Sequence, residues 1–240
     1  MRILKLFILF SIVLLSCKTE EPQNTPTISI PSTKVIETSL VEVKSKTGRI
    51  WMDRNLGASQ VATSQTDEKA YGDLYQWGRG ADGHQLRTSP TTNTLSTTDV
   101  PGNAFFITST NYDWRSPKND NLWQGVNGVN NPCPAGFRLP TDAEWDVEIK
   151  TWDLSKLKSG IFFVSPLKLT LGGYRGNSLK GNASVVDSVG QVVIFWSSTS
   201  YIINSKETSG SISFGFSNSY VSKIYGDNRI FGRCIRCIKD

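Results

Sequence analysis

Two cysteines near the C-terminus, Cys234 and Cys237, have a residue type and a spacing that could do chemistry. Their C-x-x-C spacing is compatible with a redox pair, with half of a metal site, or with half of a disulfide beside a spare thiol. A redox pair works at the N-terminus of a helix, but we predict a strand here. Residues three apart on a strand point to opposite faces, so these thiols can scarcely bond to each other or share a metal.

The chain has one histidine, His84, in the polar stretch ADGHQL. A general base built on it would need an orienting carboxylate, and Asp82 is the only acidic residue within two positions. We predict instead an exposed loop histidine. No serine lies in a G-x-S-x-G or S-x-x-K pattern, and the glycine-rich stretches lack the phosphate-binding patterns. We therefore predict no catalytic residue and no enzyme activity.

Carboxylates and indoles occur together in the stretch NYDWRSPKNDNLWQGVNGVNN, at Asp113, Trp114, Asp120 and Trp123. Carboxylate oxygens suit calcium and aromatic faces suit sugar rings, so these four residues are candidates for ligand binding, with calcium as a candidate cofactor. The alternative is structural, because Asp and Asn stabilise turns and tryptophans fill the core beneath loops. The stretch lacks the EF-hand pattern and the E-P-N and W-N-D tripeptides of lectin calcium sites, which favours the structural alternative.

The N-terminal residues predict the compartment. Residues 1–16 carry two positive charges and an apolar run that is too short for a membrane-spanning helix of about 20 residues. The run ends in LLSC, which resembles a bacterial lipobox, so we predict a signal peptide over 1–16 and acylation of Cys17. Residues 17–33 have the composition of a flexible linker. In it, Glu20 and Glu21 resemble the export signals of Bacteroidetes surface lipoproteins, with ordinary solvated charges as the alternative.

The charge pattern argues against a basic surface that binds nucleic acid or lipid headgroups. The net charge is +5, and removal of Arg2 and Lys5 with the signal peptide leaves 5 − 2 = +3. The basic residues are scattered, so we predict neither a nucleic-acid track nor a polybasic membrane patch. The protein would contact the membrane through its N-terminal lipid.

Short strands, long loops and one helix must position these residues. A hairpin is predicted around Lys46–Gly48, and a loop-rich stretch follows from Asn55 to Asn131. A capping box at Thr141 and Glu144 begins a helix over about 142–152. Strands are predicted at 192–196, at 212–216 with one exposed face, and at 229–238. A helix between strand clusters indicates an α+β domain.

Six motifs in order carry a family resemblance: GRIWMDRNLG, AYGDLYQWGR, NPCPAGFRLPTDAEW, GGYR, FWSST and IRCIKD. They resemble the Fibrobacter succinogenes major paralogous domain (FISUMP) of Bacteroidetes lipoproteins, which is similar to the formylglycine-generating and C-type lectin-like folds. The resemblance implies a C-type lectin-like domain over 34–240, with small twisted antiparallel sheets, one main helix, long irregular loops and a last strand beside the first. The tryptophans inside these motifs (Trp51, Trp77, Trp145 and Trp196) are predicted to be core residues.

The same resemblance bears on the cysteines. Formylglycine-generating relatives use a reactive pair with copper, but no cysteine occurs from Phe195 to Phe231, so the oxidase alternative is disfavoured. An exported chain meets an oxidising compartment, and the partner of the terminal pair should be Cys133. Aligning the family ending G-x-x-I-R-C onto Gly232–Cys237 makes Cys237 the paired cysteine and leaves Cys234 free. Serine at Cys133 or Cys237 should therefore lower the melting temperature, whereas Cys234→Ser should hardly change it.

The sequence thus predicts a lipid-anchored lipoprotein of the outer membrane, exposed on the cell surface, with a non-catalytic binding or adhesion module for a glycan or protein ligand. A structural envelope component is the second alternative. The DSV stretch resembles a Bacteroidetes O-glycosylation acceptor, with Ser188 as the attachment point.

Overall fold

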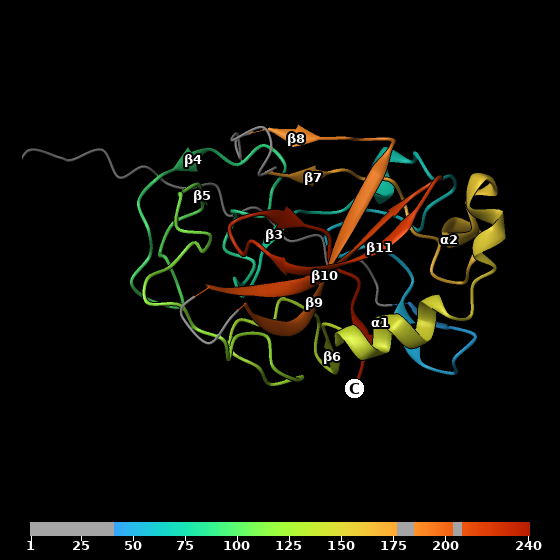
Figure 1. The fold of residues 1–240 in the computed structure, drawn as a ribbon, viewed down its shortest axis with the longest axis horizontal. Helices are drawn as coiled ribbons and strands as arrows, with labels where there is room; N and C mark the ends of the chain where they lie inside the picture. Colours follow the sequence, from blue (N-terminus) through green and yellow to red (C-terminus); the bar gives the residue numbers. More distant parts are fainter. Residues whose placement is uncertain (1–40, 177–184, 204–207) are drawn as a thin grey trace, which may run out of the picture. The chain divides into compact units, whose positions relative to one another are not determined.

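The computed structural model describes residues 41–176, 185–203 and 208–240 (Figure 1). The predicted signal peptide, Cys17 and the linker lie outside these residues. In chain order the elements are β1 (Glu42–Lys44), β2 (Ile50–Met52), the 3-10 helix η1 (Glu68–Ala70), β3 (Tyr75–Gln76), β4 (Thr91–Thr92), β5 (Phe106–Ile107), β6 (Phe137–Arg138), α1 (Asp142–Ile149), the 3-10 helix η2 (Leu154–Ser159), α2 (Ile161–Val164), β7 (Tyr174–Arg175), β8 (Val186–Asp187), β9 (Val192–Ile203), β10 (Thr208–Ser217), β11 (Val221–Asp227), β12 (Gly232–Arg233) and β13 (Ile238–Lys239).

The described strands form three small antiparallel sheets and one parallel pair. The sheets have the orders β1-β2-β13-β6, β11-β10-β9 and β3-β12-β7-β8, and the parallel pair is β4-β5. Few residues are helical. The chain is therefore an α+β protein, as the sequence predicts.

The two ends of the described domain meet in one sheet. The predicted hairpin is present, with Val43 opposite Trp51, and Gly48 takes a positive φ of 85° in its turn. The C-terminal strand β13 then pairs with β2 on one side and β6 on the other, so that Ile238 lies opposite both Trp51 and Arg138. Because β2 is held on both edges, its Trp51 is fully buried.

Helix α1 begins where its capping box predicts. The Thr141 side chain accepts from the Glu144 backbone N–H, and the Glu144 carboxylate accepts from the Thr141 N–H. The helix ends at Ile149, three residues before the predicted Trp152, and the chain continues in turns. Trp145 is fully buried and Trp152 nearly so, which confirms the predicted apolar face.

Strand β10 differs from its prediction, because neither face of its middle is exposed. Phe214 and Phe216 are buried as expected, but Ser211 and Ser213 on the other face are buried too. β10 lies between β9 and β11, and its serines are covered by buried ion pairs: the Ser213 hydroxyl donates to Asp227. The alternation of Ser with Phe predicts that the serine face is exposed to solvent, whereas in the structure this face is covered by buried polar groups.

The last predicted strand, 229–238, is broken into β12 and β13. Between them the chain passes from one sheet to another: Cys234 forms a parallel bridge with Phe195 of β9, and the Cys237 carbonyl accepts from the Met52 N–H of β2. This crossing ties three sheets together, which a single continuous strand could not do.

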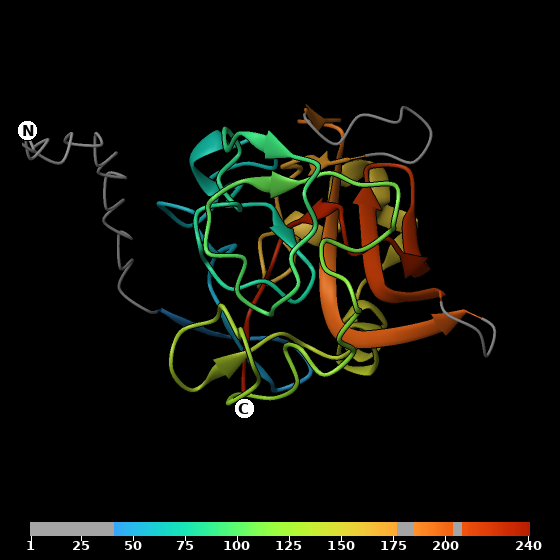
Figure 2. The ribbon, with the colours of Figure 1, turned by 90° about the vertical axis from the view of Figure 1, so that its left-hand side faces the viewer.

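The buried side chains form two clusters. One lies around Trp145, Phe195 and Phe216, and the other around Trp77, Trp123 and Trp196. Figure 2 shows that the chain from about 75 to 131, drawn in green, gathers beside the β9–β11 sheet. The second cluster contains Trp114, Leu122 and Trp123 from this stretch, so the long loops have a core of their own. The four tryptophans predicted as core residues are all fully buried.

Candidate functional site

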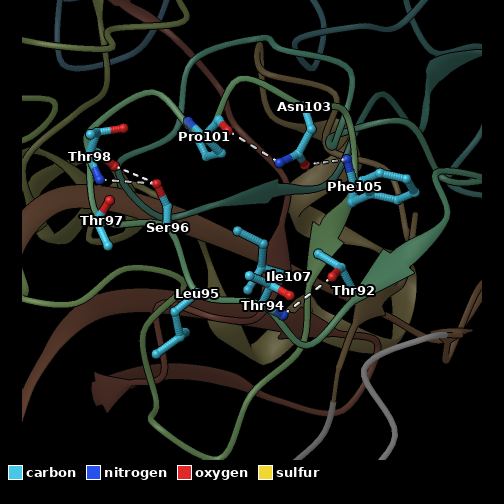
Figure 3. Close-up of a pocket in the computed structure, with 10 residues that line it drawn as sticks. All are labelled: Thr92, Thr94, Leu95, Ser96, Thr97, Thr98, Pro101, Asn103, Phe105 and Ile107. Atoms are coloured by element: carbon cyan, nitrogen blue, oxygen red, sulfur yellow. Dashed lines mark hydrogen bonds between the residues drawn. The ribbon is translucent and has the colours of Figure 1, made fainter. Parts of the chain in front are cut away.

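A pocket of about 390 Å³ lies in the loops between β4 and β5 (Figure 3). Five of its lining residues carry hydroxyls and none carries a charge. The lining residues are Thr92, Thr94, Leu95, Ser96, Thr97, Thr98, Pro101, Asn103, Phe105 and Ile107. This volume is in the lower part of the roughly 300–1,000 Å³ range of small-ligand sites.

Short side-chain turns hold the pocket wall. The Thr92 hydroxyl accepts from the Thr94 N–H at 3.2 Å, and Ser96 Oγ accepts from the Thr98 N–H while donating to the Thr98 carbonyl. On the opposite wall, the Asn103 side chain accepts from the Phe105 N–H at 3.0 Å. Ser, Thr and Asn stabilise such turns locally, so this wall is ordered without long strands.

Two buried side chains anchor the pocket from beneath. Arg79 donates to the carbonyls of Asn103 and Phe105. Gln76 exchanges two hydrogen bonds with the backbone of Ile107, at 2.7 and 3.0 Å. Both side chains are fully buried. The rim and the floor of the pocket are therefore fixed to β3 and to the turn that follows it.

The outer part of the wall is joined to the loop that follows β5. The Ser96 N–H donates to the Trp114 carbonyl, and Asp99 pairs with Arg115 at 3.1 Å. Asn119 Nδ2 also donates to Asp99, at 3.0 Å. The Asp99 carboxylate beside the wall is thus already paired with an arginine of the protein, and it does not line the pocket.

The two carboxylates that are candidate calcium ligands, Asp113 and Asp120, are brought together, but around an arginine. Arg229 lies 3.6 Å from the Asp113 carboxylate and donates to Asp120 at 2.5 Å. Its guanidinium stacks over the Trp77 ring at 4.1 Å. Burial raises the pKa of Asp113, which Arg229 partly offsets. A calcium ion would have to displace this fully buried cation, so the pair is a structural ion-pair site.

The tryptophans predicted as sugar platforms are core residues. Trp114 and Trp123 are both 0% exposed, and their indole N–H groups donate to backbone carbonyls, of Trp77 from Trp114 and of Arg79 and Asn130 from Trp123. Neither ring has a face open to a ligand. The burial of these two candidate residues supports the structural alternative, which the sequence analysis also favours.

His84 is also not where the sequence predicts it. It is 0% exposed rather than exposed in a loop. Its Nδ1 lies 2.6 Å from Asp82, while Nε2 accepts from the Gln76 N–H at 3.0 Å. Burial lowers the pKa of His84 to about 4, and the hydrogen bond to Asp82 offsets only part of this shift. Both ring nitrogens are engaged, so this neutral histidine has a structural role and cannot serve as a general base.

The disulfide between Cys133 and Cys237 is present, with the Cα atoms 6.0 Å apart. Cys234 is free and buried, and its thiol lies 3.7 Å from the Tyr71 carbonyl as a weak donor. Burial raises the pKa of Cys234 to about 11. A protonated, solvent-excluded thiol is a poor nucleophile, so the C-x-x-C spacing here is not a redox motif.

Several buried arginines were not predicted from the sequence. They are Arg79, Arg175, Arg229, Arg233 and Arg236. Arg233 makes a bidentate pair with Asp227, whereas Arg236 donates to Asn55 and to the carbonyls of Met52 and Leu167. Burial lowers the pKa of Arg236 to about 9. Where the chain passes between sheets, these arginines donate hydrogen bonds to backbone carbonyls. They thereby take the place of the hydrogen bonds that a regular helix or strand would supply.

Within residues 41–176, 185–203 and 208–240, no group of three or more His, Cys, Asp or Glu side chains is arranged to hold a metal, and no helix is long and apolar enough to span a membrane. Searches against protein-family models, curated proteins and solved structures gave no match to the chain. The family assignment therefore stays a prediction from the motifs.

The pocket itself could not be predicted from the sequence. Its wall comes from the stretch SPTTNTLSTTDVPGN at 89–103, where Ser and Thr are dense and Pro and Gly bound the run. This composition could have identified a hydroxyl-rich loop. It could not have identified a pocket, because the wall is shaped by Arg79 and Gln76 from another part of the chain.

Proposed function

We propose that this protein is a lipid-anchored lipoprotein of the outer-membrane surface whose domain, of the FISUMP type with a C-type lectin-like fold, acts as a non-catalytic binding or adhesion module. The observation that carries the binding proposal is the preformed pocket between β4 and β5, which is lined by hydroxyl and apolar groups without any ionisable side chain. Such a lining can recognise a ligand, but it holds no ionisable group that could activate one of its hydroxyls or act as an acid or base.

Two features support the fold assignment within this proposal. The C-terminal strand β13 lies beside β2 of the first hairpin, and a single main helix packs near small sheets joined by long loops. Both are what the motif resemblance implies. The lipid anchor is supported by the LLSC stretch, which predicts acylation of Cys17.

The oxidase alternative needs a reactive cysteine pair, and the geometry of the cysteines disfavours it. Cys133 and Cys237 are bonded to each other, and Cys234 is a buried thiol with a raised pKa. Incubation of the protein and copper with a cysteine-containing sulfatase peptide should leave the peptide mass unchanged. Conversion of that cysteine to formylglycine would contradict the non-catalytic proposal.

The binding proposal is tested with the mature chain, residues 17–240 carrying Cys17→Ser so that no acyl group is attached. The chain is immobilised and probed with panels of purified glycans and of purified extracellular proteins. We expect saturable, reversible binding to at least one panel member, with the ligand recovered chemically unchanged. Absence of binding to every member of both panels would favour a structural envelope component instead.

The anchor has its own test in intact cells. We expect the native N-terminus to be an acylated Cys17, detected by mass spectrometry, and surface protease to remove the domain. Cys17→Ser should release the protein into the soluble fraction. If the domain resists protease on intact cells but is cleaved after lysis, the protein lies on the inner side of the envelope.

A further inference from the structure

We propose that the pocket between β4 and β5 binds an uncharged saccharide without calcium, with Thr94, Thr97 and Phe105 as the contacting residues. This inference rests on the proposed binding function and narrows its ligand to one chemical class. A protein ligand elsewhere on the domain would leave the binding function intact while contradicting the inference.

Some polar groups of the pocket wall are used within the protein, and others remain free for a ligand. Ser96 Oγ is used as donor and acceptor within the wall, and Thr98 Oγ1 donates to the Val100 carbonyl at 2.7 Å. By contrast, the hydroxyls of Thr94 and Thr97 make no hydrogen bond within the described part of the chain, and both residues are exposed. Each hydroxyl can donate one hydrogen bond and accept others.

Two further donors complete the set. Thr92 Oγ1 accepts from the Thr94 N–H, which leaves its own O–H free to donate. Asn103 Nδ2 uses one N–H on the Pro101 carbonyl at 3.2 Å, so its second N–H is free. A mixed array of donors and acceptors matches ligand hydroxyls, because these groups also both donate and accept.

The absence of charge in the lining selects against ionic ligands. None of the ten lining side chains is ionisable, and the nearby Asp99 carboxylate is held by Arg115. A carboxylate or sulfate entering the pocket would lose hydration without gaining a counter-ion. For the same reason a calcium ion has no carboxylate ligand there, which separates this site from calcium-dependent sugar binding.

The apolar part of the lining suits the C–H face of a sugar ring. The Phe105 side chain lies at the edge of the group of lining residues (Figure 3) and is 43% exposed. Its backbone carbonyl accepts a hydrogen bond from the buried Arg79 side chain. Leu95, which is half-buried, contributes further apolar surface, whereas Ile107 is 1% exposed and belongs to the core beneath the pocket. An exposed aromatic ring on a rigid backbone loses little conformational entropy on binding. The pocket volume, at the low end of ligand sites, favours a single terminal sugar over a long chain.

Matched probes and variants test the inference. The mature chain is titrated calorimetrically with neutral hexoses or short neutral glycans selected on an array, and with the uronic acids of the same ring configuration. We expect the neutral member of each pair to bind at least about 10-fold more tightly, and chelation of calcium to have no effect. Tighter binding of the uronic acid, or loss of binding on chelation, would overturn the inference.

Phe105→Ala and Thr97→Val should each weaken binding on the order of 10-fold, because the first removes the stacking ring and the second leaves a ligand hydroxyl unpartnered. The matched controls are Tyr112→Ala, an exposed aromatic outside the lining, and Thr91→Val, an exposed threonine outside it. Thermal unfolding should be unchanged in the two threonine variants, which replace exposed groups, and Phe105→Ala and Tyr112→Ala should cost similar stability because 43% and 54% of these residues are exposed. Equal loss in pocket and control variants, or no binding of any neutral glycan on the array, would overturn the inference.

Discussion

Breaking the disulfide between Cys133 and Cys237 should destabilise the domain strongly. The bridge joins residues 104 apart in sequence. For a loop of this length, the chain-entropy model gives a stabilisation of about 4.7 kcal/mol at 25 °C. A domain of this size changes its melting temperature by about 2–4 °C per kcal/mol, so Cys133→Ser should lower it by about 10–20 °C. Cys133 is the better site for serine, because it is only partly buried whereas Cys237 is fully buried.

The assay is thermal unfolding followed by circular dichroism, with and without a reducing agent. Reduced wild type should melt near oxidised Cys133→Ser, and reduction should leave the variant unchanged. In the mature chain carrying Cys17→Ser, thiol titration under denaturing, non-reducing conditions should find one free thiol, that of Cys234. A Cys133→Ser variant that melts within about 2 °C of wild type would refute the entropy reasoning at this loop length, and three free thiols would refute the bridge itself.

The structure also changes the expectation for the spare thiol. From the sequence, Cys234→Ser should hardly alter the melting temperature. Cys234 is, however, fully buried in the core beside the Tyr71 carbonyl. A serine there places a hydroxyl in an apolar site with one acceptor at hand, so we expect a loss of about 1 kcal/mol. This loss is still well below that of Cys133→Ser in the same melting experiment.

The remaining predictions concern helix capping and pH. Thr141→Ala should lower the free energy of unfolding, measured in urea titrations, by about 1 kcal/mol. Glu144→Ala should lower it by more, because Glu144 also forms an ion pair with Arg138. Equal losses in the two variants would contradict this expectation. The pKa of His84 is lowered to about 4 in the folded protein. As the pH falls, the histidine is therefore protonated in the unfolded chain before it is protonated in the folded one. The free energy of unfolding should fall by about 3 kcal/mol as the pH drops from about 6.5 to about 4. Burial raises the pKa of Asp73 to about 6, so its protonation should stabilise the native state as pH drops from about 6 to about 4. His84→Gln and Asp73→Asn should therefore change the slope of stability against pH in opposite directions, and a common direction would contradict both assignments.

Local patterns predicted the elements that are held by local contacts. The capping box at Thr141 and the turn at Gly48 involve neighbours in sequence, so the start of α1 and the first hairpin could be predicted from residue type alone. The end of α1 and the break in the last strand could not, because tertiary contacts decide them: Cys234 pairs with β9 and Cys237 with β2.

Polar side chains misled the prediction where the fold buries them. Ser213 on β10 and His84 in its loop have residue types that usually face solvent. Both are buried because a partner on a neighbouring element satisfies them: Asp227 of β11 accepts from Ser213, and the Gln76 N–H of β3 donates to His84. Such a partner cannot be identified from spacing in a single sequence. The same limit explains why the pocket, which Arg79 holds in shape, was not found from its threonine-rich wall.

The most direct test of the account is to map where a neutral sugar contacts the domain. The isotopically labelled mature chain is titrated with the neutral hexose that binds best in calorimetry, and amide chemical shifts are followed by nuclear magnetic resonance. We expect the saturable shift changes to be concentrated in residues 92–107, and the Phe105→Ala variant to need about 10-fold more sugar to reach the same shift changes. Saturable changes centred elsewhere, or no saturable change at all, would contradict it.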